Sequence, residues 1–381
     1  MSLKTKILSF IMAVGIAFSF SSCADTTYAH IINGDKVPSG VYLGYLVQAY
    51  MEGSQKVTDT AADPFTQQID GVDFKQWVKN RAYEITTKNA AISILFKENG
   101  CEFTDTDKAT IDSYNNAMWS YYGALYEENG TSKASLRKIS EIDYMYNILF
   151  KKLYDTGGSK EVAEDAIKTY YADNNILVKQ IAFSFLKPDG TKRSESELAE
   201  LKATAEKYLA RANKGEDMDK LIKEYNDAVA SESSSESSSS ASSASSEISS
   251  AQGSSSESSP VSSSESSSDT SSDEEVNPNF VLIDKNNTTS LSADTIALYQ
   301  ALKAGKAEIV TIADTSYNVV MRYDILAEKE VYNKNRLSML YEMKKTDFEQ
   351  IITDKTASLD VVTNEKSIKR YDPKKIVIPE Q

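Results

Sequence analysis

Histidine and cysteine are nearly absent from this sequence, and their scarcity excludes several kinds of catalysis. His30 is the only histidine among 381 residues, and Cys23 and Cys101 are the only cysteines. A zinc site needs several Cys and His ligands, and a Ser-His-Asp triad needs a histidine beside its serine. A glycine-rich phosphate loop of the Walker type is missing as well. We therefore expect no metal centre, no cofactor and no hydrolytic triad.

Positive charge is also in short supply. The chain has 42 Lys and Arg against 56 Asp and Glu, which gives a formal net charge of −14. Residues 1–22 contain Lys4 and Lys6 but no acid, so the chain from Cys23 onward carries about −16. Nucleic-acid phosphates are bound by Lys and Arg, and this sequence has no basic runs. We expect no nucleic-acid partner.

Long hydrophobic runs are absent except for one stretch at the N-terminus. Residues 7–18 (ILSFIMAVGIAF) follow Lys4 and Lys6 and lead to Ser21, Ser22 and Cys23. About a dozen apolar residues are too few to span a bilayer. Their order, with positive charge first and small residues last, is typical of a signal peptide. The end of the run resembles a bacterial lipobox, although Phe20 stands where Leu is usual.

This pattern predicts a lipoprotein. We expect cleavage of a signal peptide that comprises residues 1–22 and a lipid on the thiol of Cys23, with residues 23–28 as a tether. Diacylation is enough for stable anchoring at a membrane. An ordinary signal peptide that happens to contain a cysteine is the alternative. With Cys23 lipidated, Cys101 has no partner for an intrachain disulfide. We expect the protein at the extracytoplasmic face of a bacterial cytoplasmic membrane.

A serine-rich tract separates two parts of the chain. Residues 231–276 are mostly serine with scattered Glu and Asp and contain no base. Such a composition cannot bury enough apolar surface to offset the entropy of ordering, so we predict disorder. The tract either links two domains or interrupts one, and the residues on its two sides decide between these alternatives.

Strand and helix patterns occur on both sides of the tract. In chain order they predict strand 176–185, helices 196–213 and 217–229, then, beyond the tract, strand 280–283, a helix from Ser292, and strands 309–312 and 317–323. Neither side has enough strands to form a stable sheet alone. We therefore predict one α+β domain, residues 168–230 with 277–327, and interpret 231–276 as an insertion within it.

The remaining sequence favours helices. Apolar residues recur at helical spacing through 38–153 and again through 331–352. One predicted buried stripe consists of Ile111, Tyr114, Met118, Tyr121, Tyr122 and Leu125. Residues 29–32 (AHII) and 359–362 (LDVV) favour strands that pair with each other, and Asn33-Gly34 marks a turn. We predict a helical domain assembled from both chain ends, residues 29–167 with 328–381.

Three segments resemble the PrsA/SurA group of extracytoplasmic foldases. Residues 31–38 (IINGDKVP) are similar to the opening strand and turn of that family, 215–225 (GEDMDKLIKEY) to the second parvulin helix, and 302–309 (LKAGKAEI) to the element before the last strands. The resemblance implies an α+β protein in which a discontinuous helical chaperone domain carries a parvulin-like peptidyl-prolyl isomerase domain. It also implies unfolded or nascent secreted polypeptides as partners and, for a lipoprotein foldase, a Gram-positive envelope.

The histidines of the parvulin family are missing from this sequence. Parvulins carry one histidine on the first strand and one on the last, and here Gln180 and Asn318 stand at or beside these positions. The loop that shapes the proline pocket is missing too. Amides donate and accept hydrogen bonds, so Gln180 and Asn318 either bind each other in an inactive site or line an unusual active one. We expect a chaperone with weak or no isomerase activity. The alternatives are an active isomerase with an atypical site and a non-enzymatic scaffold for one dedicated partner.

Binding of non-native clients requires exposed and adaptable apolar surface. The predicted helices between residues 105 and 153 are rich in Met, Tyr and Trp, which provide large contact areas, and Tyr and Trp keep a polar edge. Trp119, Tyr126 and Tyr144 fall off the predicted buried stripes. We therefore expect these three side chains to face client polypeptides.

Overall fold

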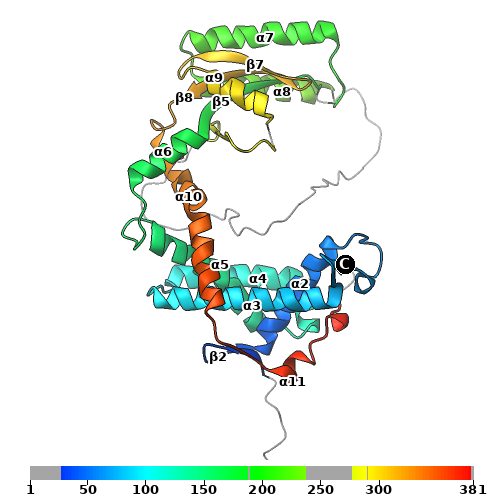
Figure 1. Ribbon diagram of the computed structural model, residues 1–381. Helices are drawn as coiled ribbons and strands as arrows, with labels where there is room; N and C mark the ends of the chain where they lie inside the picture. Colours follow the sequence, from blue (N-terminus) through cyan, green and yellow to red (C-terminus); the bar gives the residue numbers. More distant parts are fainter. Residues whose placement is uncertain (1–26, 188, 237–276, 290, 379–381) are drawn as a thin grey trace, which may run out of the picture. The chain divides into compact units, whose positions relative to one another are not determined.

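The computed structural model describes residues 27–187, 189–236, 277–289 and 291–378 (Figure 1). The chain divides into two compact units, Met1–Glu161 with Lys344–Gln381 and Val162–Met343. The sequence placed the domain boundaries near residues 167 and 328, whereas the two units divide after residues 161 and 343. The predicted signal peptide, Cys23 and residues 237–276 of the serine-rich tract lie outside the described residues.

The first unit is mostly helical and contains both ends of the described chain. Its three-stranded sheet has the order β2-β1-β9, formed by β1 (Tyr28–Ile32), β2 (Asp35–Pro38) and β9 (Val361–Thr363). Its helices are α2 (Ser39–Lys56), α3 (Phe74–Glu98), α4 (Asp105–Glu128), α5 (Lys133–Tyr154), the C-terminal part of α10 (Lys329–Ala357) and α11 (Glu365–Ile368). Shorter elements are η1 (Pro64–Thr66), β3 (Gln68–Ile69), β4 (Val72–Asp73) and η2 (Pro373–Lys375). We call this the helical unit.

Antiparallel pairing of β1 with β9 holds the two chain ends together, as the sequence predicted. The turn between β1 and β2 has positive φ at Asn33 (49°) and Gly34 (89°), the conformation that a two-residue hairpin of type I′ requires. The same turn binds the chain in front of β9. The Asn33 amide N–H donates to the Asp360 carbonyl oxygen at 2.9 Å, and the Asp360 amide N–H donates to Asn33 Oδ1 at 2.8 Å.

Helix α4 buries only part of the stripe that the sequence predicted, including Ile111 and Leu125. Three residues of the predicted buried stripe are exposed instead: Tyr114, Tyr121 and Tyr122. The buried face includes Asn115 and Gly123. Asn115 Nδ2 donates to the Lys133 carbonyl oxygen at 3.4 Å, and Gly123 lies against the indole of Trp119. The prediction was right for Ile111 and Leu125 and wrong for the three tyrosines, because a count of apolar side chains overlooks a buried small residue and a buried amide.

The second unit is an α+β sheet structure. Its elements are α6 (Glu164–Asn174), β5 (Asn175–Ser184), α7 (Glu195–Asn213), α8 (Met218–Glu236), β6 (Val281–Asp284), α9 (Ala293–Ala301), β7 (Ala307–Ile312) and β8 (Ser316–Tyr323). The four strands form an antiparallel sheet in the order β6-β5-β8-β7. Strand β5 precedes the serine-rich tract and pairs with two strands that follow it. The two sides of the tract therefore belong to one sheet, as predicted, and the α+β fold class is confirmed.

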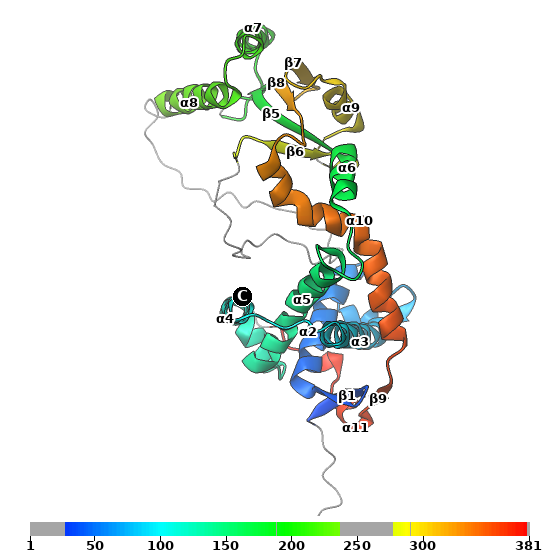
Figure 2. The ribbon, with the colours of Figure 1, turned by 90° about the vertical axis from the view of Figure 1, so that its left-hand side faces the viewer.

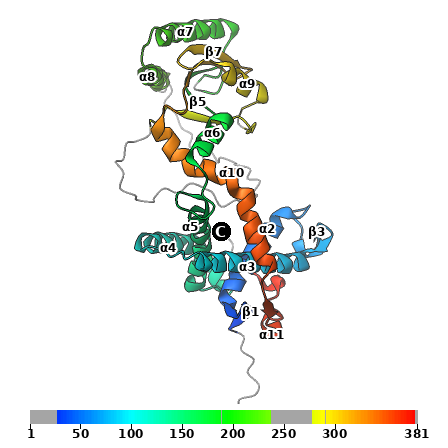
Figure 3. The ribbon, with the colours of Figure 1, turned by 60° about the vertical axis from the view of Figure 1, so that its left-hand side comes forward.

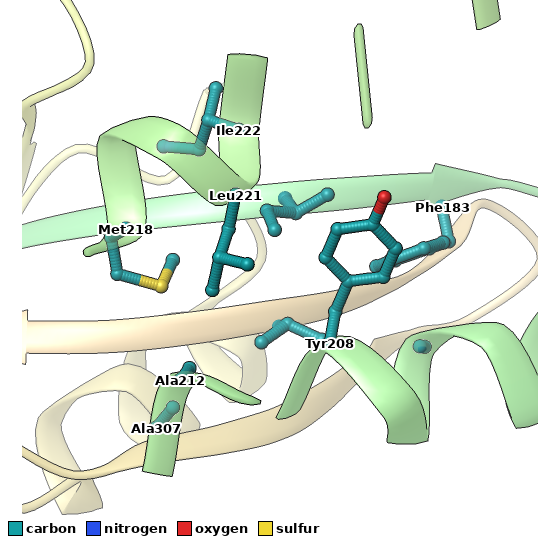
Figure 4. Packing of buried hydrophobic residues seen from close by; sticks show 10 residues of the cluster. Phe183, Tyr208, Ala212, Met218, Leu221, Ile222 and Ala307 are labelled. Atoms are coloured by element: carbon teal, nitrogen blue, oxygen red, sulfur yellow. The ribbon is translucent and has the colours of Figure 1, made fainter. Parts of the chain in front are cut away.

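The sheet of the second unit has a hydrophobic core on each face. Figures 2 and 3 show α8 and α9 on opposite faces of the sheet. Phe183 of β5 packs with Tyr208 of α7 and Leu221 of α8 on one face (Figure 4). Val178 of β5 packs with Tyr299 of α9 on the other. Alternate residues of β5 thus serve the two cores, as the side-chain period of a strand requires.

Helix α8 extends further than predicted. The sequence predicted a helix that ends at Val229 and disorder from Ser231, but α8 continues to Glu236. Once a helix has been nucleated, each further residue adds one backbone hydrogen bond, so serine and glutamate can prolong it. This part of the predicted boundary is wrong by six residues.

His30 is buried where the two chain ends meet. Its Nδ1 lies 3.2 Å from Thr363 Oγ1, and its ring meets the rings of Tyr42 and Tyr83 edge-on at centroid distances of 5.2 and 5.6 Å. Its Nε2 has no hydrogen-bond partner among the described residues. Burial lowers the pKa of His30 to about 4, and the negative charge of Glu365 opposes this only in part. The folded protein therefore favours the neutral imidazole.

Acid should destabilise the helical unit through His30. The pKa of this group is about 4 in the folded chain and near 6.5 in the unfolded chain, so the unfolded chain binds more protons between these values. Its contribution to stability is complete above pH 6.5 and is lost as the pH falls towards 4. We expect a loss of about 2 kcal/mol from this group between pH of about 7 and about 4.5.

Urea unfolding followed by tryptophan fluorescence measures this loss, because both tryptophans, Trp77 and Trp119, belong to the helical unit. His30→Gln is the control, because this variant retains every carboxylate that titrates in this pH range and lacks only the imidazole. The variant should lose less stability on acidification than the wild type. An equal loss in both proteins would contradict the prediction.

Candidate functional site

Gln180 and Asn318 lie on neighbouring strands and meet the side chain of Tyr299. In the pairing of β5 with β8, Gln180 lies opposite Val320 and Asn318 lies opposite Ala182, so both amides lie on the same face of the sheet. Tyr299 Oη donates to Gln180 Oε1 at 2.7 Å. Asn318 Nδ2 lies 3.3 Å from Gln180 Oε1 and 3.1 Å from Tyr299 Oη. We call these three residues the amide cluster.

Helix α9 covers the amide cluster. Tyr299 is 1% exposed and Asn318 is 2% exposed, while Gln180 is half-buried. Val178 and Val320 belong to the hydrophobic core that surrounds Tyr299. Asn318 Oδ1 has no hydrogen-bond partner within the described part of the chain. A peptide cannot reach Asn318 or Tyr299 while α9 occupies this position.

The amide cluster has no group that exchanges protons near neutral pH. Burial raises the pKa of Tyr299, and the hydrogen bond with Asn318 opposes the rise only in part. Amide side chains donate and accept hydrogen bonds without ionising. General acid-base catalysis needs a group whose pKa lies near the working pH, and none is present here. What the cluster does supply is mutual hydrogen bonding of three buried polar side chains.

Sequence reasoning identified Gln180 and Asn318 but missed Tyr299. The available signal was the helical spacing of Thr295, Ile296 and Tyr299, which places the three on one face of α9, and all three are buried. Nothing in the sequence showed that this face would cover the strand positions of the two amides.

The opposite face of β5 holds a buried positive charge. Lys179 Nζ donates to Asp219 Oδ2 at 2.7 Å, and only 8% of the Lys179 side chain is exposed. Asp219 also accepts hydrogen bonds from Asn277 Nδ2 at 2.6 Å and Asn279 Nδ2 at 2.9 Å. Lys179 Nζ lies 4.2 Å from the centre of the Phe280 ring. We call these five residues the lysine clamp.

The lysine clamp keeps Asp219 ionised. Burial of Asp219 opposes ionisation, but hydrogen bonds from Lys179, Asn279 and Asn277 outweigh it and hold the pKa of this carboxyl below its usual value. Asp219 lies near the start of α8, and Asn277 and Asn279 follow the serine-rich tract. The clamp therefore fixes the chain that returns from the tract to the strand and helix that precede it.

The three aromatic residues predicted to bind clients differ in exposure. Tyr126 is only 6% exposed and packs with Val47 and Leu136, so it offers no surface to a client. Trp119 is half-buried against the same cluster. Tyr144 of α5 is half-buried as well. The structure brings Trp119 and Tyr126 together in the packing of the helical unit rather than on its surface.

A different set of tyrosines is exposed on α4. Tyr121 is 83% exposed, and Tyr114 and Tyr122 are each 44% exposed. They are spaced seven and eight residues apart, so they share one side of the helix. Burial raises the pKa of Tyr114, and the negative charge of Asp143 raises it further. We call Tyr114, Tyr121 and Tyr122 the tyrosine face.

Among the residues that the structure describes, no group of three or more His, Cys, Asp and Glu side chains is arranged to hold a metal ion. Within the same part of the chain, no helix combines the length and the apolar character needed to cross a membrane.

Comparisons with known proteins give structural likeness at low sequence identity. No protein-family model matches the sequence, and no curated protein matches it. The chain is similar to the foldase protein PrsA from Streptococcus pneumoniae, with 15% identity and a TM-score of 0.34 over 80% of this chain and 93% of that one. For PrsA from Bacillus subtilis the identity is 15% and the TM-score 0.32, over 84% and 98% of the two chains. For the foldase protein PrsA from Lactococcus lactis they are 11% and 0.34, over 91% and 99%. All three carry the name of the family that the sequence motifs resemble.

Removal of the Tyr299 hydroxyl should destabilise the second unit. Tyr299→Phe leaves Gln180 Oε1 with only the longer hydrogen bond from Asn318 and removes the hydroxyl that Asn318 contacts, and we expect a cost of about 1 to 2 kcal/mol. Hydrogen exchange of the backbone N–H groups of β7 and β8 measures the change in stability. Tyr317→Phe is the matched control, because Tyr317 lies on β8 and faces the other core. A cost of Tyr299→Phe no larger than that of Tyr317→Phe would show that the cluster contributes nothing to stability.

Proposed function

We propose that this protein is an extracytoplasmic chaperone, anchored to the membrane by a lipid on Cys23, that holds unfolded secreted polypeptides and has little or no prolyl isomerase activity. The observation that carries the proposal is the tyrosine face of α4, an exposed aromatic surface on a rigid helix. The sequence motifs that resemble extracytoplasmic foldases support it.

The tyrosine face suits the binding of varied non-native segments. Tyrosine presents a large apolar ring and a polar hydroxyl, so its exposure to water before binding is tolerated. Three such exposed rings within about two turns of α4 are a feature of the kind that marks interaction sites. Ile111, Leu125 and Tyr126 of the same helix are buried and fix α4 against the rest of the helical unit. The surface is thus held in place without contributing to the core.

The amide cluster supports the absence of strong isomerase activity. Rotation about a peptide bond has a barrier of about 18–20 kcal/mol, and an enzyme lowers it by holding a twisted amide in a fitted pocket. Here the polar groups at the positions of the family's histidines are occupied by one another and covered by α9. Asn318 and Tyr299 are almost fully buried, so their polar groups are not presented to a substrate.

The lipid anchor is supported by the sequence of the N-terminus. A positive region, a short apolar run and small residues precede Cys23. Tyr28, the first residue of β1, follows Cys23 by only five positions. An anchor on Cys23 would keep the helical unit close to the membrane surface.

Loss of the tyrosine face should weaken client holding. The double variant Tyr121→Ala with Tyr122→Ala removes two exposed rings, and substitutions at such surface positions change stability by about 0.5 kcal/mol or less. We expect the variant to lose at least half of its ability to suppress aggregation of several unrelated denatured proteins. Light scattering at equal molar ratios, with the mature chain lacking lipid, measures this.

Leu298→Ala is the matched control for this experiment, because Leu298 is 49% exposed and lies on α9 in the second unit. It should leave the suppression of aggregation unchanged. Equal losses of aggregation suppression in both variants would show that the tyrosine face has no specific role in client binding. Capture of one client at fixed stoichiometry, with no effect on the others, would favour a dedicated scaffold.

The protein should not accelerate proline isomerisation. We expect the rate of cis-to-trans conversion in a proline-containing peptide to change less than about twofold at micromolar protein. The amide cluster has no group that transfers protons near neutral pH and is not accessible to a peptide. Asn318→Ala should leave this rate unchanged. Clear acceleration by the wild type that Asn318→Ala abolishes would show instead that the amide cluster is an active site.

A further inference from the structure

The C-terminal segment is positively charged although the protein is acidic. Residues 365–378 contain five bases and two acids in a chain whose net charge is −14. All five bases are exposed: Lys366, Lys369, Arg370, Lys374 and Lys375. They are not all consecutive in sequence. They lie in α11, in η2 and in the short link between these two elements. We call residues 365–378 the basic segment.

Little negative charge opposes the basic segment. Of its two acids, Asp372 forms an ion pair with Lys75 at 2.8 Å, and the hydrogen bond from Lys75 holds the pKa of Asp372 below its usual value. The other acid is Glu365. Among the described residues, none of the four lysines of the segment forms an ion pair with a carboxylate. Lys374 Nζ lies 5.6 Å from the centre of the Phe65 ring, which does not neutralise it.

The basic segment is fixed beside the first strand of the chain. Asn364 Nδ2 donates to the Tyr28 carbonyl oxygen at 3.1 Å, and the Asn364 amide N–H donates to the Ala29 carbonyl oxygen at 2.9 Å. Asn364 is also the N-cap of α11, since its side chain accepts a hydrogen bond from the Ser367 amide N–H. Figure 2 shows β1, β9 and α11 side by side. The residue that binds Tyr28 thus directly precedes the basic segment.

This position lies within short reach of Cys23. Tyr28 follows Cys23 by five positions, and a fully extended chain of this length spans at most about 18 Å. A lipid on Cys23, as proposed above, would therefore place lipid headgroups near Tyr28 and the start of the basic segment. Val377 and Ile378, at the end of the segment, are also exposed. Exposed apolar residues next to lysines are typical of surfaces that lie on a membrane.

We propose that the basic segment docks the helical unit onto the anionic headgroups of the membrane in which the lipid on Cys23 is anchored. This inference rests on the lipid anchor of the proposed function. Lysines close to an anionic bilayer each strengthen binding, whereas the acidic remainder of the protein is repelled by it. The anchor and the basic segment together would give the unit a preferred orientation, with β1 and α11 towards the membrane.

Lysine acetylation of the vesicle-bound protein tests this proposal. The mature chain is coupled through the Cys23 thiol to a maleimide lipid in vesicles of phosphatidylcholine, with or without phosphatidylglycerol. Coupling is selective because Cys101 is buried. We expect Lys366, Lys369, Lys374 and Lys375 to react at least threefold more slowly on the anionic vesicles than on the neutral ones. The protection should disappear at about 1 M salt, where the screening length is about 3 Å.

Lys133 and Lys138, which are exposed on α5, are internal controls and should react equally on both kinds of vesicle. Equal reactivity of the basic segment on the two kinds of vesicle, or equal protection of the control lysines, would overturn the proposal. Protection of the basic segment by soluble poly(glycerol phosphate) but not by vesicles would also overturn it and identify a wall polymer as the partner. Because the coupling is chemical, failure of the docking proposal is distinguishable from failure of the lipid anchor in the cell.

Discussion

The antiparallel pairing of β1 with β9 is the contact on which the helical unit depends. It joins residues as far apart in sequence as His30 and Thr363, which are separated by 333 positions. The entropy of closing such a loop grows only with the logarithm of its length, so the separation itself is a modest cost. In return, the pairing buries His30 and brings Asn364 to the Tyr28 carbonyl oxygen. Because both chain ends are bound in this sheet, the second unit is an insertion into the first.

Much of this architecture follows from local patterns in the sequence. Asn33-Gly34 predicted the hairpin correctly because few residues adopt positive φ readily. The β-branched residues of 176–185 predicted β5, and the shortage of strands on either side of the serine-rich tract predicted that they share a sheet. The buried face of α4 was not predictable in the same way. Besides apolar residues, its buried side includes Asn115 and Gly123, which contribute one hydrogen bond and a contact with the Trp119 indole rather than apolar area.

In the candidate sites, too, some residues could be predicted from the sequence and others could not. The strand positions of Gln180 and Asn318 could be found by matching motifs, because the register of β5 and β8 is set by alternation along each strand. Tyr299 could not be found, since its contact with both amides depends on how α9 packs across the sheet. The tyrosine face escaped prediction for a related reason. Trp119 and Tyr126 were expected on the surface, but Tyr126 is buried and Trp119 half-buried against Gly123, while Tyr121 is exposed.

The lysine clamp has a consequence for how much the serine-rich tract can vary. Asp219 near the start of α8 is hydrogen-bonded directly to Asn277 and Asn279, so the two sides of the tract meet at a fixed, charged contact inside the unit. Doubling the number of residues between two such fixed points costs only about 0.6 kcal/mol of closure entropy. A longer tract would therefore cost the unit little, whereas loss of Lys179 would leave the Asp219 carboxylate without its ion-pair partner.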